Sequence, residues 1–186
     1  MTGIIDSLAI QNILNKADLI HSEREIQLAL DDMAMNIHRH LNGKYPVCLV
    51  VMQGALVVAG QLLPRLNIPL EMDYIHTTRY RGATRGGELH WIKHPDITLK
   101  DRNVLIIEDI LDEGLTLKAI VEYCKKAGAL EVLTSVLVEK QLPSRPGLQQ
   151  ADFSALHVPN RYIFGYGMDY QEQLRHVPGI YAVNGL

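Results

Sequence analysis

A regular alternation of apolar runs with helical patterns constrains the fold of this chain more than any other feature of its sequence. Four runs are apolar or β-rich, as expected of strands: 47–52, 70–78, 104–107 and 131–138. Three segments have the composition or spacing of helices: 22–41, 54–63 and 117–127. Ser22, followed by Glu25, forms a capping box that marks the start of the first helix. Together these patterns predict a mostly parallel β-sheet with helices on both faces.

The size and composition of the chain indicate one folded domain. Its 186 residues are 47% hydrophobic and 21% charged, which is enough to bury one sizeable core. The apolar runs are too short to span a bilayer and no secretory signal pattern is present, so we expect a cytoplasmic protein with no membrane partner. A net charge of −3 gives no general attraction to nucleic acid. Cys48 and Cys124 fall in apolar patterns and are expected to be reduced core thiols.

The segment 106–117, IIEDILDEGLTL, places four carboxylates at the end of a predicted strand: Glu108, Asp109, Asp112 and Glu113. A helix is predicted to follow, and the free N–H groups at a helix start can bind a phosphate without positive side chains. Those groups would come from Glu113, Gly114, Leu115 and Thr116. The carboxylates then need a separate task, and both accepting hydrogen bonds from sugar hydroxyls and binding Mg²⁺ are suitable. A sugar phosphate with a metal-bound pyrophosphate would satisfy the whole cluster.

In the same region four apolar residues, an acidic pair, two apolar residues and Asp-x-Gly-x-Thr follow one another along 104–116. This order resembles the phosphoribosyl pyrophosphate signature of the phosphoribosyltransferases. From about Ile20 to Val183 the chain looks most like the hypoxanthine-guanine phosphoribosyltransferases. The resemblance implies an α/β, type I phosphoribosyltransferase-like fold, a mostly parallel sheet flanked by helices. It also implies one domain, 1–186, with a core at about 20–160 and a small hood over the base from about 161–186 plus the N-terminal residues.

The resemblance further implies a reaction in purine salvage. Members of the family transfer the 5-phosphoribosyl group from phosphoribosyl pyrophosphate to hypoxanthine or guanine, through a transition state of oxocarbenium character. The products are IMP or GMP and pyrophosphate, and Mg²⁺ is the implied cofactor. Because relatives are dimers or tetramers, we expect a homodimer or homotetramer.

The resemblance assigns roles to the residues of the acidic segment. Asp112 corresponds to the residue at N7 of the base, as proton acceptor or hydrogen-bond partner. Glu108 and Asp109 would face the ribose hydroxyls, directly or through Mg²⁺. Glu113 departs from the family pattern, which usually has Thr or Ser there. One hydroxyl contact to the 5′-phosphate is therefore not expected, whereas the backbone contact is.

Other segments correspond to the pyrophosphate site. Gln53 and Gly54 follow the first strand, where the family binds pyrophosphate through backbone N–H groups, often with a strained or cis peptide. Arg175 matches an arginine that contacts pyrophosphate. Tyr80 lies in a Gly- and Arg-rich segment that matches the family's mobile lid. An ordinary turn at Gly54 and a solvated basic hairpin around Tyr80 are the alternatives.

The base itself would be recognised from two further strands. Lys140 corresponds to the donor to the 6-oxo group, which favours 6-oxopurines over adenine. Tyr162 would stack on the purine. Ile163 and Asp169 would offer carbonyls near position 2, and Asp169 could contact a second Mg²⁺ through water. The alternatives are a surface lysine and an apolar stripe that belongs to the core.

Two other functions compete with this interpretation. An enzyme of the same fold could prefer xanthine, although the carbonyls of Ile163 and Asp169 would repel its 2-oxo group. A non-catalytic regulator of the same fold would be expected to lose Asp112 or the lid and to gain a basic face, and the sequence shows neither change. His90 and His94 have an i, i+4 spacing but adjoin Pro95, so we interpret them as structural and not as a zinc site.

Overall fold

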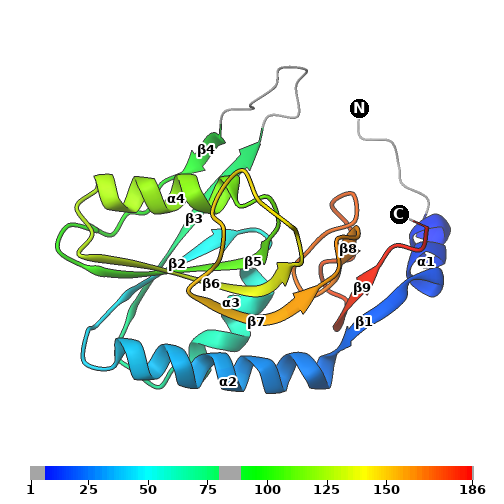
Figure 1. The fold of residues 1–186 in the computed structure, drawn as a ribbon, viewed down its shortest axis with the longest axis horizontal. Helices are drawn as coiled ribbons and strands as arrows, with labels where there is room; N and C mark the ends of the chain where they lie inside the picture. Colours follow the sequence, from blue (N-terminus) through cyan, green and yellow to red (C-terminus); the bar gives the residue numbers. More distant parts are fainter. Residues whose placement is uncertain (1–6, 80–88, 186) are drawn as a thin grey trace.

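The computed structural model describes residues 7–79 and 89–185, which form a six-stranded sheet, a three-stranded sheet and flanking helices (Figure 1). The helices are α1 (Ser7–Lys16), α2 (Glu23–Leu41), α3 (Leu56–Leu62), the 3₁₀ turn η1 (Leu63–Arg65) and α4 (Leu115–Lys126). The strands are β1 (Asp18–Ser22), β2 (Val47–Met52), β3 (Glu71–Arg79), β4 (Leu89–Lys93), β5 (Asn103–Leu111), β6 (Glu131–Lys140), β7 (Phe153–Val158), β8 (Ile163–Phe164) and β9 (Gly179–Ala182).

The large sheet has the strand order β4-β3-β2-β5-β6-β7. All neighbouring strands pair in parallel except β4, which pairs antiparallel with β3 at one edge. The predicted mostly parallel sheet is therefore confirmed. Because β2 lies between β3 and β5, the chain changes its direction of travel across the sheet at this strand. In open α/β sheets such a switch point, at the carboxyl ends of the strands, is the usual place for a ligand.

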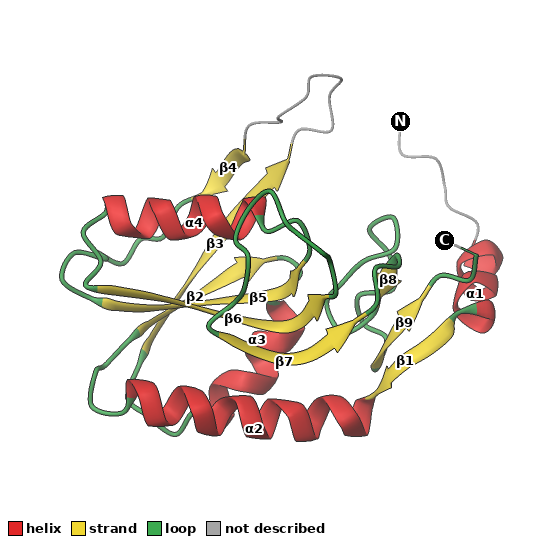
Figure 2. Ribbon diagram, viewed as in Figure 1, coloured by secondary structure: helices red, strands yellow, loops and turns green. Residues whose placement is uncertain are grey.

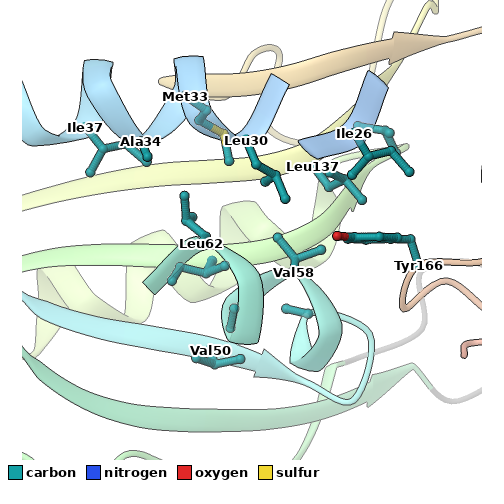
Figure 3. Packing of buried hydrophobic residues seen from close by; sticks show 14 of the residues in the cluster. Ile26, Leu30, Met33, Ala34, Ile37, Val50, Val58, Leu62, Leu137 and Tyr166 are labelled. Atoms are coloured by element: carbon teal, nitrogen blue, oxygen red, sulfur yellow. The ribbon is translucent and has the colours of Figure 1, made fainter. Parts of the chain in front are cut away.

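Helices cover both faces of this sheet (Figure 2). On one face, α2 and α3 bury apolar side chains against β2, β5 and β6. Figure 3 shows Ile26, Leu30 and Ile37 of α2 directed toward the sheet, with Val58 and Leu62 of α3 beside them. On the other face α4 contributes its own buried stripe, Leu117, Ile120 and Cys124.

The start of α2 shows how a short sequence pattern determines a local structure. The backbone N–H of Ser22 donates to the Glu25 carboxylate over 2.7 Å, and the Ser22 hydroxyl accepts from the Glu25 N–H over 3.4 Å. The capping box predicted from the sequence is therefore present. It sets the helix phase in which Ile26, Leu30 and the residues at helical spacing after them are buried.

A second, three-stranded antiparallel sheet has the order β1-β9-β8. It joins the two ends of the chain, since Asp18 of β1 is in register with Ala182 of β9. Phe164, Leu174 and Val177 pack there against residues of α1. This small sheet lies beyond the carboxyl ends of β5, β6 and β7 (Figure 1). It therefore stands next to the edge of the large sheet where the acidic segment emerges.

Strands of the large sheet differ in part from the sequence predictions. The predicted strand at 104–107 continues to Leu111, because its ladder to β6 extends through the pair Ile110 and Val138. Glu108 and Asp109 are therefore strand residues and not part of the turn. The strand β4, which the sequence patterns did not predict, follows the Gly- and Arg-rich segment and pairs with β3. Tyr80 and the rest of the predicted lid at 80–88 lie outside the described residues.

Among the residues that the structure describes, none of the helices has the length and apolar character needed to cross a membrane.

Candidate active site

The phosphate loop predicted from the sequence occupies the turn between β5 and α4. Gly114 has a left-handed backbone, with φ of 73°, and α4 begins at the next residue. A side chain at Gly114 would also collide with the backbone of Leu148, so both conformation and space require glycine here. The first turn of α4 is in place, since the Lys118 N–H donates to the Gly114 carbonyl over 3.0 Å. The turn thus brings the amino end of a twelve-residue helix to the carboxyl edge of the sheet.

Glu108 and Asp109 form a buried acid pair at the end of β5. Their residues are only 8% and 7% exposed, and the Asp109 N–H donates to the Glu108 carboxylate over 3.2 Å. Burial raises the pKa of Glu108 well above its usual range, and the adjacent Asp109 charge adds to the shift. Burial also raises the pKa of Asp109, although hydrogen bonding from Glu108 and the positive charge of Arg175 oppose it. Because the pKa values of both groups are raised even with Arg175 nearby, the negative charge of this pair is only partly compensated within the protein.

The donor set of this pair fits Mg²⁺. Carboxylate oxygens are the ligands that Mg²⁺ prefers, and a cation would balance the negative charge of the buried pair. Within 7–79 and 89–185 there is no cluster of three or more His, Cys, Asp or Glu side chains that could hold a metal. The protein would therefore provide one or two ligands, and substrate oxygens and water the others, which is the usual way in which Mg²⁺ is bound.

The turn after β2 packs directly on the acid pair. The Met52–Gln53 peptide is cis, in agreement with the family pattern. A side chain at Gly54 would overlap the Asp109 carboxylate, and one at Gly167 would overlap the Gly54 carbonyl. Two glycines thus allow the turn after β2, the end of β5 and the segment after β8 to meet at one point.

Arg175 and Asp169 lie in the segment that follows β8. They form an ion pair at 2.8 Å, and Arg175 also donates to the Gly167 carbonyl over 2.7 Å. The Asp169 carboxylate additionally accepts from the Glu172 N–H at 2.8 Å. Because the Arg175 charge acts on Asp109, this pair belongs to the same site as the acid pair. The side chains of Asp169 and Arg175 are 27% and 30% exposed, which leaves both accessible to a ligand.

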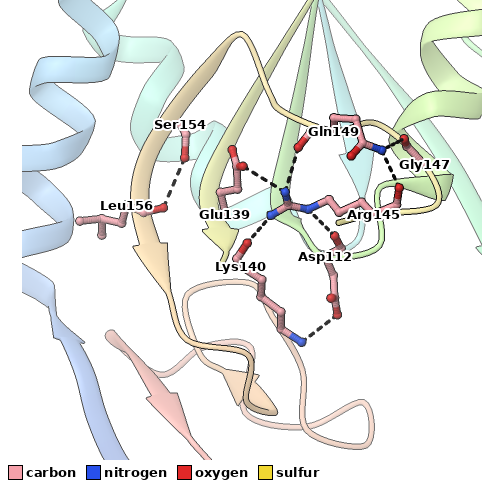
Figure 4. A network of polar contacts seen from close by, with 8 residues as sticks. All are labelled: Asp112, Glu139, Lys140, Arg145, Gly147, Gln149, Ser154 and Leu156. Atoms are coloured by element: carbon pink, nitrogen blue, oxygen red, sulfur yellow. Dashed lines mark hydrogen bonds and ion pairs between the residues drawn. The ribbon is translucent and has the colours of Figure 1, made fainter. Parts of the chain in front are cut away.

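Asp112 and Lys140 are brought together from two adjacent strand ends. Lys140 Nζ donates to the Asp112 carboxylate over 2.8 Å (Figure 4). The Asp112 side chain is 44% exposed and that of Lys140 only 11%, so the lysine is not a surface residue. The structure thus excludes the alternative of a solvated lysine, and a basic and an acidic group share one position beside the phosphate loop.

Tyr162 immediately precedes β8, and its side chain is not part of the core. The residue is 40% exposed and meets Tyr170 edge to face, with ring centroids 5.6 Å apart. In contrast, Ile163 is buried in β8 and is in register with Ala182 of β9. The predicted apolar stripe therefore has two parts. The Tyr162 ring is exposed and available for stacking, and the adjacent strand β8 is buried.

The structure shows one set of residues that the sequence patterns did not single out. Arg145, in the connection between β6 and β7, is buried with Glu139 and hydrogen-bonded to the backbone of Asp112 (Figure 4). Arg145 lies in a connection without helical or strand periodicity, so no sequence pattern indicated its position. Glu139, which directly follows the apolar run 136–138 of β6, was the available signal that a buried cation lies nearby.

The two cysteines are buried and free. Burial raises the pKa of Cys48 and of Cys124 to about 12, so neither is available as a nucleophilic thiolate near neutral pH.

Comparisons with known proteins agree with this geometry. The family described as phosphoribosyl transferase domain matches residues 16–171. The hypoxanthine-guanine phosphoribosyltransferase of Bacillus subtilis is 33% identical over 160 residues, which cover 86% of this chain and 88% of the relative.

Two solved structures share the complete fold. A hypoxanthine phosphoribosyltransferase from Staphylococcus aureus superimposes with a TM-score of 0.86 at 27% identity, covering 96% of each chain. A hypoxanthine-guanine-xanthine phosphoribosyltransferase superimposes with a TM-score of 0.83 at 26% identity, covering 91% of this chain and 98% of the other.

Proposed function

Because this chain belongs to the phosphoribosyltransferase family, we propose that it is a purine salvage enzyme of the hypoxanthine-guanine type. It transfers the 5-phosphoribosyl group of phosphoribosyl pyrophosphate to hypoxanthine or guanine, which gives IMP or GMP and pyrophosphate. The observation that carries the proposal is the contact between Asp112 and Lys140 beside the phosphate loop. This contact supports the proposal, because it joins a carboxylate that can accept a proton to a cationic donor beside the loop that we propose binds the sugar phosphate.

The base is recognised on one edge and one face. N7 and the 6-oxo group lie on the same edge of a 6-oxopurine, and Asp112 and Lys140 meet these two atoms. The ammonium donates to the 6-oxo oxygen and disfavours adenine, whose 6-amino group is itself a donor. Tyr162 stacks on the ring, and the carbonyls of Ile163 and Asp169 lie near position 2.

The reaction replaces the pyrophosphate on C1 of the ribose by the base. As the bond from C1 to the pyrophosphate oxygen breaks, N9 of the base forms the new bond, and the proton on N7 passes to the Asp112 carboxylate. The amides of Glu113, Gly114, Leu115 and Thr116 hold the 5′-phosphate, with the Thr116 hydroxyl as a further donor. Gln53, Gly54 and Arg175 bind pyrophosphate, and we propose that Tyr80 closes over it.

Mg²⁺ would be held by Glu108 and Asp109, with Asp169 as a ligand through water, and would neutralise charge on the pyrophosphate. The acid pair also accepts hydrogen bonds from the ribose hydroxyls. Burial of the pair, at 8% and 7% exposure, keeps water from competing for these contacts.

The architecture supports one domain, 1–186, with the small sheet as a hood. The sheet β1-β9-β8 carries Tyr162 next to β8 and faces the carboxyl ends of the large sheet. We propose that a core at about 20–160 binds the sugar phosphate, while residues 161–186 and the N-terminal residues cover the base.

We also propose that the chain forms a homodimer or homotetramer in the cytoplasm. Large apolar side chains are exposed on neighbouring elements, with Met72 of β3 at 60%, Ile92 of β4 at 54% and Leu56 of α3 at 58%. Such side chains are typical of a covered surface. Sedimentation of the wild-type protein, Met72→Glu and Ile92→Glu measures the oligomeric state, and we expect the two variants to weaken the oligomer. A monomeric wild-type protein would contradict the proposed homodimer or homotetramer. Two free cysteines suit a reducing compartment.

One assay tests the proposed function. Consumption of hypoxanthine, guanine, xanthine and adenine is measured with phosphoribosyl pyrophosphate, with and without Mg²⁺. We expect turnover of hypoxanthine and guanine that EDTA abolishes and excess Mg²⁺ restores. Absence of turnover with all four bases would contradict the proposal and favour a non-catalytic regulator.

Xanthine is the second candidate substrate, because a structure named for hypoxanthine, guanine and xanthine shares this fold at a TM-score of 0.83. The carbonyls proposed near position 2 repel its 2-oxo group, so we expect its initial rate to be the lower one. A higher rate with xanthine would require a donor near Ile163 that the proposed geometry does not include.

A further inference from the structure

The side chain of Arg145 is buried but has no part in the reaction described above. Only 6% of it is exposed, and its charge is balanced by Glu139 at 3.3 Å. Its Nε donates to the Asp112 carbonyl over 2.8 Å, and its terminal nitrogens donate to the carbonyls of Gln149, over 2.8 Å, and of Lys140. Figure 4 shows the guanidinium between the two strand ends. A single side chain thus contacts the backbone of both proposed base-recognising residues.

These contacts begin where the ladder between β5 and β6 ends. In the ladder between β5 and β6 the last pair in register is Leu111 with Glu139. Asp112 follows the last residue of β5, and Lys140 is the last residue of β6, in register with Val158 of β7 but with no residue of β5. The guanidinium bonds to both of their carbonyls and so continues the link between the strands beyond the last ladder pair.

The connection that carries Arg145 also holds the phosphate loop. The Gly147 N–H donates to the Glu113 carbonyl and the Leu148 N–H to the Gly114 carbonyl, each over 3.0 Å. A side chain at Gly147 would overlap the backbone of Gly114. The loop for the phosphate therefore has its own backbone contacts, and these do not involve the guanidinium.

We propose that Arg145 is a positioning residue that determines the preference for 6-oxopurines. This inference rests on the proposed function. Asp112 and Lys140 must match the spacing of N7 and the 6-oxo group, which a rigid ring fixes. Arg145 sets that spacing, since its planar guanidinium offers five donors in a fixed geometry. Glu139 orients it and balances its charge.

Lysine in place of Arg145 would keep the charge near Glu139 but has no planar fork that bonds two carbonyls. We expect Arg145→Lys to lower kcat/KM for hypoxanthine by about 10- to 100-fold, the range for a misplacement of up to 1 Å. We expect KM for phosphoribosyl pyrophosphate to change less than about threefold, because the phosphate loop keeps its backbone contacts. Arg102→Lys is the matched control. Arg102 bonds Glu71 at 2.8 Å at the opposite end of the strands, and its substitution should leave both constants unchanged.

The affinities for two nucleotides distinguish a positioning role of Arg145 from a general loss of rigidity in the site. Calorimetric titration with IMP and with AMP compares a 6-oxo with a 6-amino purine on the same sugar phosphate. We expect Arg145→Lys to reduce the preference for IMP by about tenfold, and Arg102→Lys to retain it. Equal weakening of IMP and AMP, or an unchanged preference, would overturn the proposal.

Glu139→Gln provides a second variant, in which the arginine remains but loses the charge that orients its guanidinium. We expect it to reduce the IMP preference by a smaller factor, and an unchanged preference in a folded Glu139→Gln protein would also overturn the proposal. Wild-type turnover in the same assay separates the two hypotheses. No turnover would contradict the proposed function itself, whereas normal turnover with normal Arg145→Lys kinetics would contradict only the positioning role.

Discussion

Two pairs of carboxylates stand four residues apart in the segment 106–117 and have opposite surroundings. Glu108 and Asp109 are buried, and burial raises the pKa of both. Asp112 is 44% exposed in its side chain and bonds Lys140, and Glu113 is exposed. The first pair is part of β5, where Glu108 is in register with Val136, and the second pair lies in the turn beyond the last ladder pair.

The comparison shows that carboxylates before and after the end of β5 have different chemical roles. Carboxylates of one chemical type acquire different properties from burial and partners alone. A buried pair without full compensation attracts a cation and hydroxyl donors. An accessible carboxylate beside a lysine can exchange a proton with a base. The following predictions perturb one pair and leave the other in place.

Asp112→Asn removes the proton acceptor of the exposed pair and should have the largest effect. We expect kcat to fall by about 10²- to 10⁴-fold, the usual contribution of general acid–base catalysis. Affinity for IMP should change much less, because the amide can still form a hydrogen bond. Steady-state kinetics and calorimetry with IMP measure the two quantities.

Asp101→Asn is the control for this prediction. Asp101 has a positive φ of 61° in a turn at the other end of β5, a conformation that Asn also adopts. The same chemical change there should leave kcat unaltered. Unchanged turnover in Asp112→Asn would remove Asp112 from the mechanism and assign proton transfer to another group.

Gly54→Ala perturbs the buried pair through packing. The added methyl group would overlap the Asp109 carboxylate, so the turn after β2 or the acid pair must move. We expect a loss of about 1–3 kcal/mol of stability, typical of overpacking, together with a raised KM for phosphoribosyl pyrophosphate. Thermal unfolding and steady-state kinetics measure both effects.

Gly60→Ala is the matched control, since a side chain at Gly60 meets nothing within 4 Å. Gly60 lies within α3, where alanine is favoured over glycine by about 1 kcal/mol, so this variant should be more stable than the wild type. If Gly54→Ala behaved in the same way, the close packing of the turn on Asp109 would not matter to the site.

The difference between the two pairs also explains what the sequence could predict. Apolar runs and helical spacing predicted the four inner strands β2, β3, β5 and β6 and the helices α2, α3 and α4, because burial of strands and helix faces imposes local periods. Val47–Met52 was predicted without error for this reason. The edge strands β4 and β7 were not predicted. The sequence did not show where β5 ends, because acidic residues usually mark a turn, whereas Glu108 and Asp109 continue the ladder.

Local sequence patterns could not predict contacts between residues far apart in the chain. The small sheet pairs β1 with β9, elements more than 150 residues apart, and β8 has only two residues. Arg145 reaches Asp112 across 33 positions, with no period that links them. Two pairs of residues that the family motif singled out are nevertheless close in the structure, since Lys140 contacts Asp112 and the Arg175 charge acts on Asp109.

The buried pair should also make stability depend on pH. A carboxyl group whose pKa is raised by folding keeps its proton where the unfolded chain has lost it. Its contribution is therefore fully favourable below the ordinary pKa of 4.5 for Glu108, and it is lost as the pH rises through the raised value. A carboxylate stabilised by a salt bridge has the opposite pH dependence, because its contribution to stability is lost as the pH falls.

Glu108→Gln tests the direction of this pH dependence, and its expected effect on stability is the smallest of the predictions. Glutamine keeps an oxygen that accepts from the Asp109 N–H but cannot ionise, so at neutral pH the variant should be more stable than the wild type. A gain of about 1 kcal/mol corresponds to roughly 2–4 °C in Tm for a chain of this length. Thermal unfolding at a series of pH values should show the difference shrinking as the pH falls toward 4.5, while Glu122→Gln, an exposed change of the same charge on α4, should show none. A gain that persisted unchanged in acid would mean that packing, and not ionisation, separates the buried pair from the exposed one.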